Sequence, residues 1–145
     1  MRDMKKVSLL CATVAFLVLG CGSDGGSDDV AKWVGNWNSM GTQGTTCGAA
    51  STTSQVSTIV VVSPGASAGT IQTFAENCTA IWDLSGSTAT LRPGQTCTVT
   101  VGALNVTVTT TQGTATLNGT TIVGSQAGST NNGCSYMQQF TLTRM

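Results

Sequence analysis

Cysteine is the residue type whose spacing most restricts the chemistry of this chain. Four of the six cysteines lie far apart in a Thr-rich region, at Cys47, Cys78, Cys97 and Cys134. Zinc sites usually draw their thiolates from close Cys-x-x-Cys pairs, so this spacing predicts no metal site. Four separated cysteines in an exported domain indicate two disulfides instead, with three possible pairings.

Other side chains that could catalyse a reaction are scarce. The chain has no histidine, which is the commonest general base and metal ligand. Beyond Trp33, the only carboxylates are Glu76 and Asp83. Glu76 stands in a predicted turn and Asp83 on the outer face of a predicted strand, so we do not expect a glycosidase-like carboxylate pair. We therefore predict no catalytic residue, no cofactor and no enzymatic activity.

The first twenty residues have the pattern of an export signal. A basic start over residues 1–6 precedes an apolar run over residues 7–19. A membrane-spanning helix needs about 20 apolar residues, so this shorter run favours a signal peptide over 1–20. The bases that remain after the signal are Lys32, Arg92 and Arg144. Three scattered bases cannot form the basic patch that nucleic-acid binding requires, so we predict no nucleic-acid partner.

The apolar run ends in Val18-Leu19-Gly20-Cys21, which resembles the lipobox of bacterial lipoproteins. This resemblance implies cleavage after Gly20 and a lipid, with acyl chains such as palmitate, on Cys21. Two or three acyl chains hold a protein to a bilayer far more firmly than one. Gram-negative lipoproteins retained in the inner membrane commonly carry Asp after the cysteine, whereas Gly22 stands there in this chain. We therefore expect an exported protein, lipid-anchored to the cell envelope, in the outer membrane if the host is Gram-negative.

The rest of the chain divides in two by composition. Residues 21–32 comprise the lipidated cysteine and a Gly/Ser/Asp-rich tether, which has little to bury and is expected to be flexible. Residues 33–145 form one domain that is large enough for its own core.

The domain shows the alternating pattern of half-buried antiparallel strands. Turn signals separate the runs, among them Gln112-Gly113 and Asn118-Gly119, and the longest expected loop is Gly124–Gly133. Sequential strands leave two exposed edges unless the sheet closes, so we predict an all-β antiparallel meander that closes into a barrel, with a β-sandwich as the alternative. The predicted strands cover 33–40, 52–62, 70–75, 78–84, 87–92, 96–102, 105–111, 114–118, 120–124 and 134–143.

A closed sheet also bears on the disulfide pairing. Its first and last strands would be neighbours, which favours Cys47–Cys134. Cys78 and Cys97 begin strands at the same end of the meander, on either side of residues 87–92, which favours Cys78–Cys97.

Two resemblances extend this interpretation. Gly35-Asn36-Trp37 looks like the Gly-x-Trp motif of the lipocalin and calycin barrels, in which a late-strand arginine packs across the tryptophan. The resemblance implies a lipocalin-like barrel closed by Arg144 against Trp37. The domain also resembles small Thr/Gly-rich bacterial lipoproteins, in Asn77-Cys78-Thr79 and Thr141-Leu142-Thr143-Arg144 among other motifs, and this second resemblance implies no particular activity.

These observations favour a lipid-anchored, non-enzymatic envelope protein whose barrel binds a small apolar ligand. The alternative is a structural or protein-interaction lipoprotein without a pocket, which meets an envelope protein through its Thr-rich outer face or the Gly124–Gly133 loop. The expected partners are the membrane, through the lipid on Cys21, and either an apolar small molecule or an envelope protein. A deep apolar cavity would favour the first hypothesis and a solid interior the second.

Overall fold

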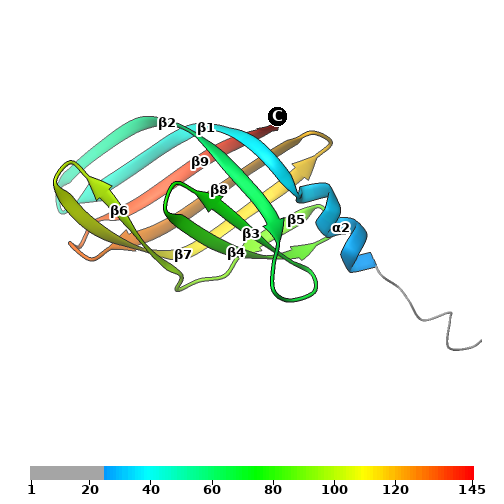
Figure 1. The fold of residues 1–145 in the computed structure, drawn as a ribbon. Helices are drawn as coiled ribbons and strands as arrows, with labels where there is room; N and C mark the ends of the chain where they lie inside the picture. The colour runs from blue at the N-terminus through cyan, green and yellow to red at the C-terminus, as the bar shows by residue number, and fades with distance from the viewer. Residues whose placement is uncertain (1–24) are drawn as a thin grey trace, which may run out of the picture.

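The described part of the protein is a small antiparallel β-barrel preceded by a helix. A computed structural model describes residues 25–145, so the predicted signal peptide and Cys21 lie outside the described residues. Within them, α2 (Gly25–Trp33) lies at one end of the barrel and the hairpin of the first two strands reaches the other end (Figure 1). The strands are β1 (Gly35–Cys47), β2 (Ala50–Pro64), β3 (Thr70–Ala75), β4 (Cys78–Ser85), β5 (Thr88–Leu91), β6 (Thr96–Val101), β7 (Leu104–Asn118), β8 (Thr121–Thr130) and β9 (Ser135–Arg144).

The sheet closes on itself with eight strand positions. Consecutive strands pair from β1 through to β5 and from β7 through to β9, and β9 returns to β1. β5 and β6 share one position because both pair with β7, β5 with residues 114–116 and β6 with residues 104–109. The predicted closed antiparallel barrel is therefore confirmed, and the sandwich alternative is wrong.

Glycine sets four of the tight hairpin turns. Gly48, Gly86, Gly102 and Gly119 each have a φ between 58° and 62° at the first central position of a two-residue turn. A positive φ at that position alone belongs to the type II′ turn, whose twist matches that of paired strands. The β3–β4 turn is the exception, because Glu76 takes the positive φ of 54° that glycine takes elsewhere.

The two ends of the barrel differ in packing. β3 and β4 have six and eight residues, whereas β2 and β7 each have fifteen. Among the described residues, β2 therefore pairs only with β1 from residue 50 to 60, and the barrel wall is incomplete beside it. Inward-facing side chains in that far half, such as Gln43 and Tyr136, are only half-buried. The apolar core fills the half beside α2 and consists of Trp33, Trp37, Val60, Val62, Ile71, Trp82, Ala89, Leu91, Ala115, Leu117, Ile122, Phe140 and Leu142.

Two expectations about the late strands are wrong. The runs 105–111 and 114–118 form one strand, β7, which passes the predicted Gln112-Gly113 turn with a bulge between Thr110 and Gln112. The predicted loop Gly124–Gly133 is mostly strand, because β8 continues to Thr130 and only a short turn precedes β9. In both places, glycines that were interpreted as turn signals lie within strands. A side chain at these positions would collide with the neighbouring backbone or with another side chain.

The start of the domain also differs from expectation. Residues 25–32 belong to α2, where a flexible tether over 21–32 was predicted, and Trp33 ends that helix rather than beginning a strand. Asp28 in the first turn and Lys32 in the last turn suit the helix dipole. Trp33 is 1% exposed, so the helix is stabilised by packing on the barrel, which the composition of the segment does not reveal.

Candidate ligand-binding cavity

A cavity of about 100 Å³ lies inside the apolar half of the barrel. Its lining has aromatic and aliphatic side chains and five uncharged polar side chains, with no charged group among them. An engineered cavity of about 150 Å³ can hold benzene, whereas drug-sized ligands occupy roughly 300–1,000 Å³. This cavity by itself therefore encloses only a few heavy atoms, and a molecule as large as benzene would project from it into the far half of the barrel. Its lining residues are Trp33, Ser39, Thr58, Val60, Val62, Ile71, Thr73, Ala75, Trp82, Ala89, Ala115, Ile122, Gln126, Gln138, Phe140 and Leu142.

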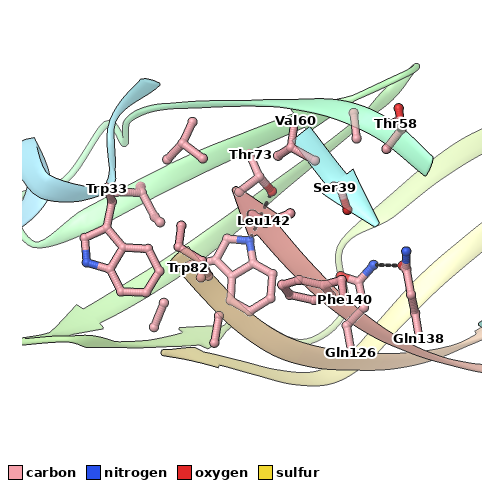
Figure 2. A pocket seen from close by; sticks show the side chains of 16 residues that line it. Trp33, Ser39, Thr58, Val60, Thr73, Trp82, Gln126, Gln138, Phe140 and Leu142 are labelled. Atoms are coloured by element: carbon pink, nitrogen blue, oxygen red, sulfur yellow. Dashed lines mark hydrogen bonds between the residues drawn. The ribbon is translucent and has the colours of Figure 1, made fainter. Parts of the chain in front are cut away.

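Aromatic rings form one wall of the cavity. Trp82 on β4 and Phe140 on β9 meet edge to face, with ring centroids 6.4 Å apart and planes at 83°. The indole Nε1 of Trp82 donates a hydrogen bond to the Thr73 hydroxyl at 3.1 Å. Figure 2 shows both rings beside the cavity, with the indole nitrogen directed at Thr73. Because its polar atom is satisfied and its position fixed, Trp82 offers a rigid apolar surface.

Two glutamine side chains form the polar side of the cavity. Gln126 on β8 and Gln138 on β9 are direct cross-strand partners, and Nε2 of Gln126 donates to Oε1 of Gln138 at 2.8 Å. Figure 2 shows this pair next to Phe140. Both side chains are half-buried and uncharged, so the site offers hydrogen bonds without an electrostatic field of either sign.

The α2 end of the barrel is closed by stacked side chains. Trp37 is fully buried, and its indole Nε1 donates to the Trp33 carbonyl oxygen at 2.9 Å. The guanidinium carbon of Arg144 lies 4.7 Å from the centroid of the Trp37 ring, and Arg144 also donates to the Lys32 carbonyl oxygen. The contact between Arg144 and Trp37 that was expected from the Gly-x-Trp motif is therefore present. Together with Trp33, these side chains seal the floor below the cavity.

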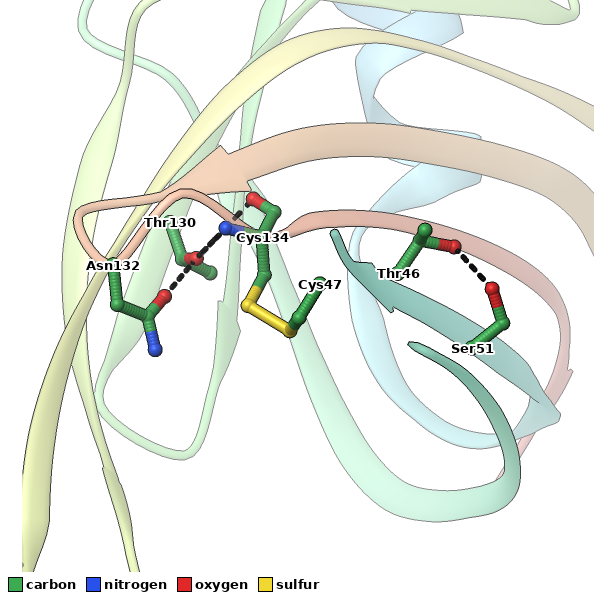
Figure 3. Close-up of a disulfide and its surroundings, with 6 residues drawn as sticks. All are labelled: Thr46, Cys47, Ser51, Thr130, Asn132 and Cys134. Carbon is green, nitrogen blue, oxygen red and sulfur yellow. Dashed lines mark hydrogen bonds between the residues drawn. A yellow bond between two sulfur atoms is a disulfide. The ribbon is translucent and has the colours of Figure 1, made fainter. Parts of the chain in front are cut away.

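Two disulfides hold the far half of the barrel, and both predicted pairings are confirmed. Cys47 at the end of β1 joins Cys134 just before β9 (Figure 3). The Thr130 hydroxyl accepts a hydrogen bond from the Cys134 backbone N–H at 3.1 Å, which ties the β8–β9 turn to the bridge. Cross-linking at this end holds together strands that few buried apolar side chains support.

The second disulfide lies where the pairing of β4 is interrupted. Cys78 of β4 joins Cys97 of β6, although these two strands are not paired along their backbones. Between β5 and β6, the Gln95 side chain takes the place of a strand partner. Its Oε1 accepts from the Ile81 backbone N–H at 2.7 Å, and its Nε2 donates to the Ile81 carbonyl at 3.0 Å. The side-chain amide thus satisfies the Ile81 backbone N–H and shares the Ile81 carbonyl oxygen with the Arg92 backbone N–H, which keeps the wall continuous.

The two carboxylates of the strand region lie apart. Glu76 is in the β3–β4 turn, and the extended chain from Cys78 to Asp83 covers about 16 Å. Asp83 is exposed and paired with Arg92 at 2.7 Å, and the hydrogen bonds from Arg92 lower the pKa of the Asp83 carboxyl. Neither carboxylate lines the cavity.

Sequence reasoning missed the polar part of the site. Gln126 fell in the segment that was read as a loop, and Gln138 was not singled out. A usable signal does exist in the alternation of Gly124, Gln126 and Gly128, which could have been recognised as one face of a strand.

Within residues 25–145, no group of three or more acidic, cysteine or histidine side chains could hold a metal ion. No helix in that same part of the chain is long and apolar enough to cross a membrane. The chain matches no protein-family model, no curated protein and no solved structure.

Proposed function

We propose that this protein is a lipid-anchored, non-enzymatic envelope protein whose barrel holds a small, uncharged and largely apolar molecule. The observation that carries the proposal is the cavity against Trp82 and Phe140, which has an apolar wall, two amides and no charge. A preformed apolar space with a few polar groups is the usual form of a small-molecule site. The volume of about 100 Å³ limits the enclosed part of the ligand to a few heavy atoms, so an acyl chain would not fit inside.

The incomplete wall beside β2 supports a route for the ligand. The other end of the barrel is sealed by Trp33, Trp37 and Arg144. The far half has half-buried polar side chains and a stretch of β2 that pairs on one side only. A ligand larger than the cavity would extend into this half, with its apolar end towards Trp82.

The lipid anchor would attach at the sealed end. Only residues 22–24 separate Cys21 from the first residue of α2, Gly25, and that length of chain reaches at most about 14 Å. β1 runs away from this end for 13 residues, roughly 43 Å along the strand. We infer that the sealed floor is the membrane-proximal part of the domain and that the β1–β2 hairpin tip can stand well clear of the bilayer.

Native mass spectrometry of the full-length protein, extracted from its host envelope in detergent, tests the ligand. We expect a small added mass that collisional activation releases. Ala115→Leu should abolish it, because Ala115 lines the cavity and the larger side chain fills it. Thr116→Leu is the matched control, since it adds the same side chain on the exposed face of the same strand. A bare mass for the unsubstituted protein under several growth conditions would count against the proposal.

The anchor has its own test. Metabolic labelling with a radioactive fatty acid should mark the unsubstituted protein and leave a Cys21→Ala variant unlabelled. Normal labelling of Cys21→Ala would contradict the assignment of the lipid to this cysteine.

A protein-interaction role is the second candidate, and the free edge of β2 favours it. Residues 50–60 of β2 have no β3 partner, and they contain no charge or proline that would discourage pairing with another strand. An extended segment of another envelope protein could add to it by backbone hydrogen bonds. Gln55→Pro should abolish chemical cross-linking to such a partner. Unchanged cross-linking would refute this role for the edge.

A further inference from the structure

The inner faces of β8 and β9 carry matching patterns. In the middle of β8 the inward-facing residues are Gly124, Gln126 and Gly128, and on β9 their direct partners are Phe140, Gln138 and Tyr136. Two glycine–aromatic pairs therefore flank one pair of amides. Because residues 124–128 of β8 offer an inward side chain only at the amide position, that amide pair stands between two aromatic rings on the inner wall.

Each glycine on β8 makes room for the ring opposite. A Cβ at Gly124 would lie 2.6 Å from the Cζ atom of Phe140, and one at Gly128 would lie 2.5 Å from Cε1 of Tyr136. Contacts that short do not occur, so larger residues would push the rings away from β8. The backbone carbonyls of β7 are equally close to both positions, which fixes the glycines further. The rings are thus held across the neighbouring strand, on either side of the glutamines.

The amide pair keeps unused hydrogen-bonding capacity. The bond between Gln126 and Gln138 uses one N–H and one carbonyl oxygen. Within residues 25–145, neither the side-chain oxygen Oε1 of Gln126 nor the side-chain nitrogen Nε2 of Gln138 has another protein partner. At least one acceptor and one donor therefore remain, whichever way round the two amides are placed. Both side chains line the cavity.

We propose that Gln126 and Gln138 form a polar subsite that holds an uncharged hydrogen-bonding group, a hydroxyl or an amide, of the ligand. This inference rests on the proposed ligand-binding function. The apolar body of the ligand lies against Trp82 and Phe140, and its polar group bonds the free acceptor and donor. A carboxylate or an ammonium group is excluded, because no opposite charge lines the cavity and an unpaired buried charge is very costly.

A purely apolar ligand is selected against by the same pair. It would displace water from the two amides without replacing the hydrogen bonds, and sites with buried polar groups reject such analogues. The glutamines are therefore specificity-determining residues, and the aromatic wall supplies the contact area.

Three matched probes test this: phenol, benzene and benzoate, added to the lipidated protein in nanodiscs with free aqueous probe concentrations measured. Side-chain amide NMR signals of Gln126 and Gln138 should shift on addition of phenol. We expect phenol to bind about fivefold or more tightly than benzene, which is the effect of roughly one net hydrogen bond. Benzoate should bind at least tenfold more weakly than phenol.

The variant Gln126→Leu/Gln138→Leu should lose the preference for phenol and bind benzene at least as well. Gln139→Leu is the control, because this glutamine is exposed on the outer face of the same strand, and it should leave the ratio unchanged. Equal binding of phenol and benzene to the unsubstituted protein, or a phenol preference that survives in the double variant, would overturn the polar subsite alone. If neither phenol nor benzene binds, the proposed function fails, and the subsite with it.

Discussion

Arg144 provides the sharpest test of how the barrel is closed. Its guanidinium lies 4.7 Å from the centre of the fully buried Trp37 ring and bonds the Lys32 carbonyl at the end of α2. The substitution Arg144→Met keeps most of the apolar stem and removes the charge and the donors. We expect it to destabilise the closed end without emptying the core.

The magnitude follows from the two contacts. A cation above an indole contributes about 0.5–2 kcal/mol, with the lower values at exposed sites such as this one. The hydrogen bond to the Lys32 carbonyl adds a smaller share, because that carbonyl can be hydrated once Arg144 is gone. We expect a loss of about 1–2 kcal/mol in the free energy of unfolding. For a domain of this size, that corresponds to a fall in Tm of roughly 4–10 °C.

Urea unfolding followed by far-UV circular dichroism measures this loss without relying on Trp37 fluorescence. Arg92→Met is the matched control, because Arg92 is an exposed arginine that pairs only with the exposed Asp83. Surface ion pairs contribute little, so this variant should stay close to the unsubstituted protein. Arg144→Lys should fall between the two, since a lysine keeps the charge and loses the planar group. If Arg144→Met and Arg92→Met were equally stable, the closure argument would be wrong.

Four further outcomes can be measured by chemical denaturation. Gln95→Leu should lower stability by about 1–3 kcal/mol, because it leaves the backbone N–H of Ile81 without its partner. Glu76→Gly should raise stability by up to about 1 kcal/mol, since glycine accepts the positive φ that glutamate adopts at a cost. Burial raises the pKa of the Tyr136 phenol. The stability that comes from burying the neutral phenol is therefore fully present below about pH 10, and it is lost as the pH rises through the higher pKa of the folded state. Tyr136→Phe should remove this alkaline loss of stability. Replacing the bridge between Cys78 and Cys97 by two serines should cost roughly 3 kcal/mol for its separation of 19 residues, and an unchanged urea midpoint would contradict that.

The parts of the fold that could be predicted from sequence are those that depend on alternation and on closure. The two-residue period of a strand places Phe140, Leu142 and Arg144 on one face, and each of them faces the interior or its closed end. Closure then made the first and last strands neighbours, which is enough to favour Cys47–Cys134 over the other pairings. Such features are local patterns joined by one topological constraint.

What could not be predicted depends on tertiary contacts. α2 begins in a Gly/Ser/Asp-rich segment with weak intrinsic helix preference, and it is stabilised by the burial of Trp33. In the sequence, Gly124 and Gly128 look like loop residues. Their actual role is to leave space for Phe140 and Tyr136, and that need arises only once β8 and β9 are paired. The same pairing brings the two glutamines together, so the polar part of the candidate site was hidden by the misassigned loop.

The division of stabilising interactions along the barrel bears directly on the proposed function. Beside α2, the apolar core and the Arg144–Trp37 contact hold the strands, so the side chains there are fixed by packing. In the far half few side chains are buried, and the bridge from Cys47 to Cys134 holds the strand ends in place of a core. A covalent link removes the need to fill that half with apolar side chains. The interior there can therefore remain polar and partly open, which is the condition that the entry of a ligand towards Gln126 and Gln138 requires.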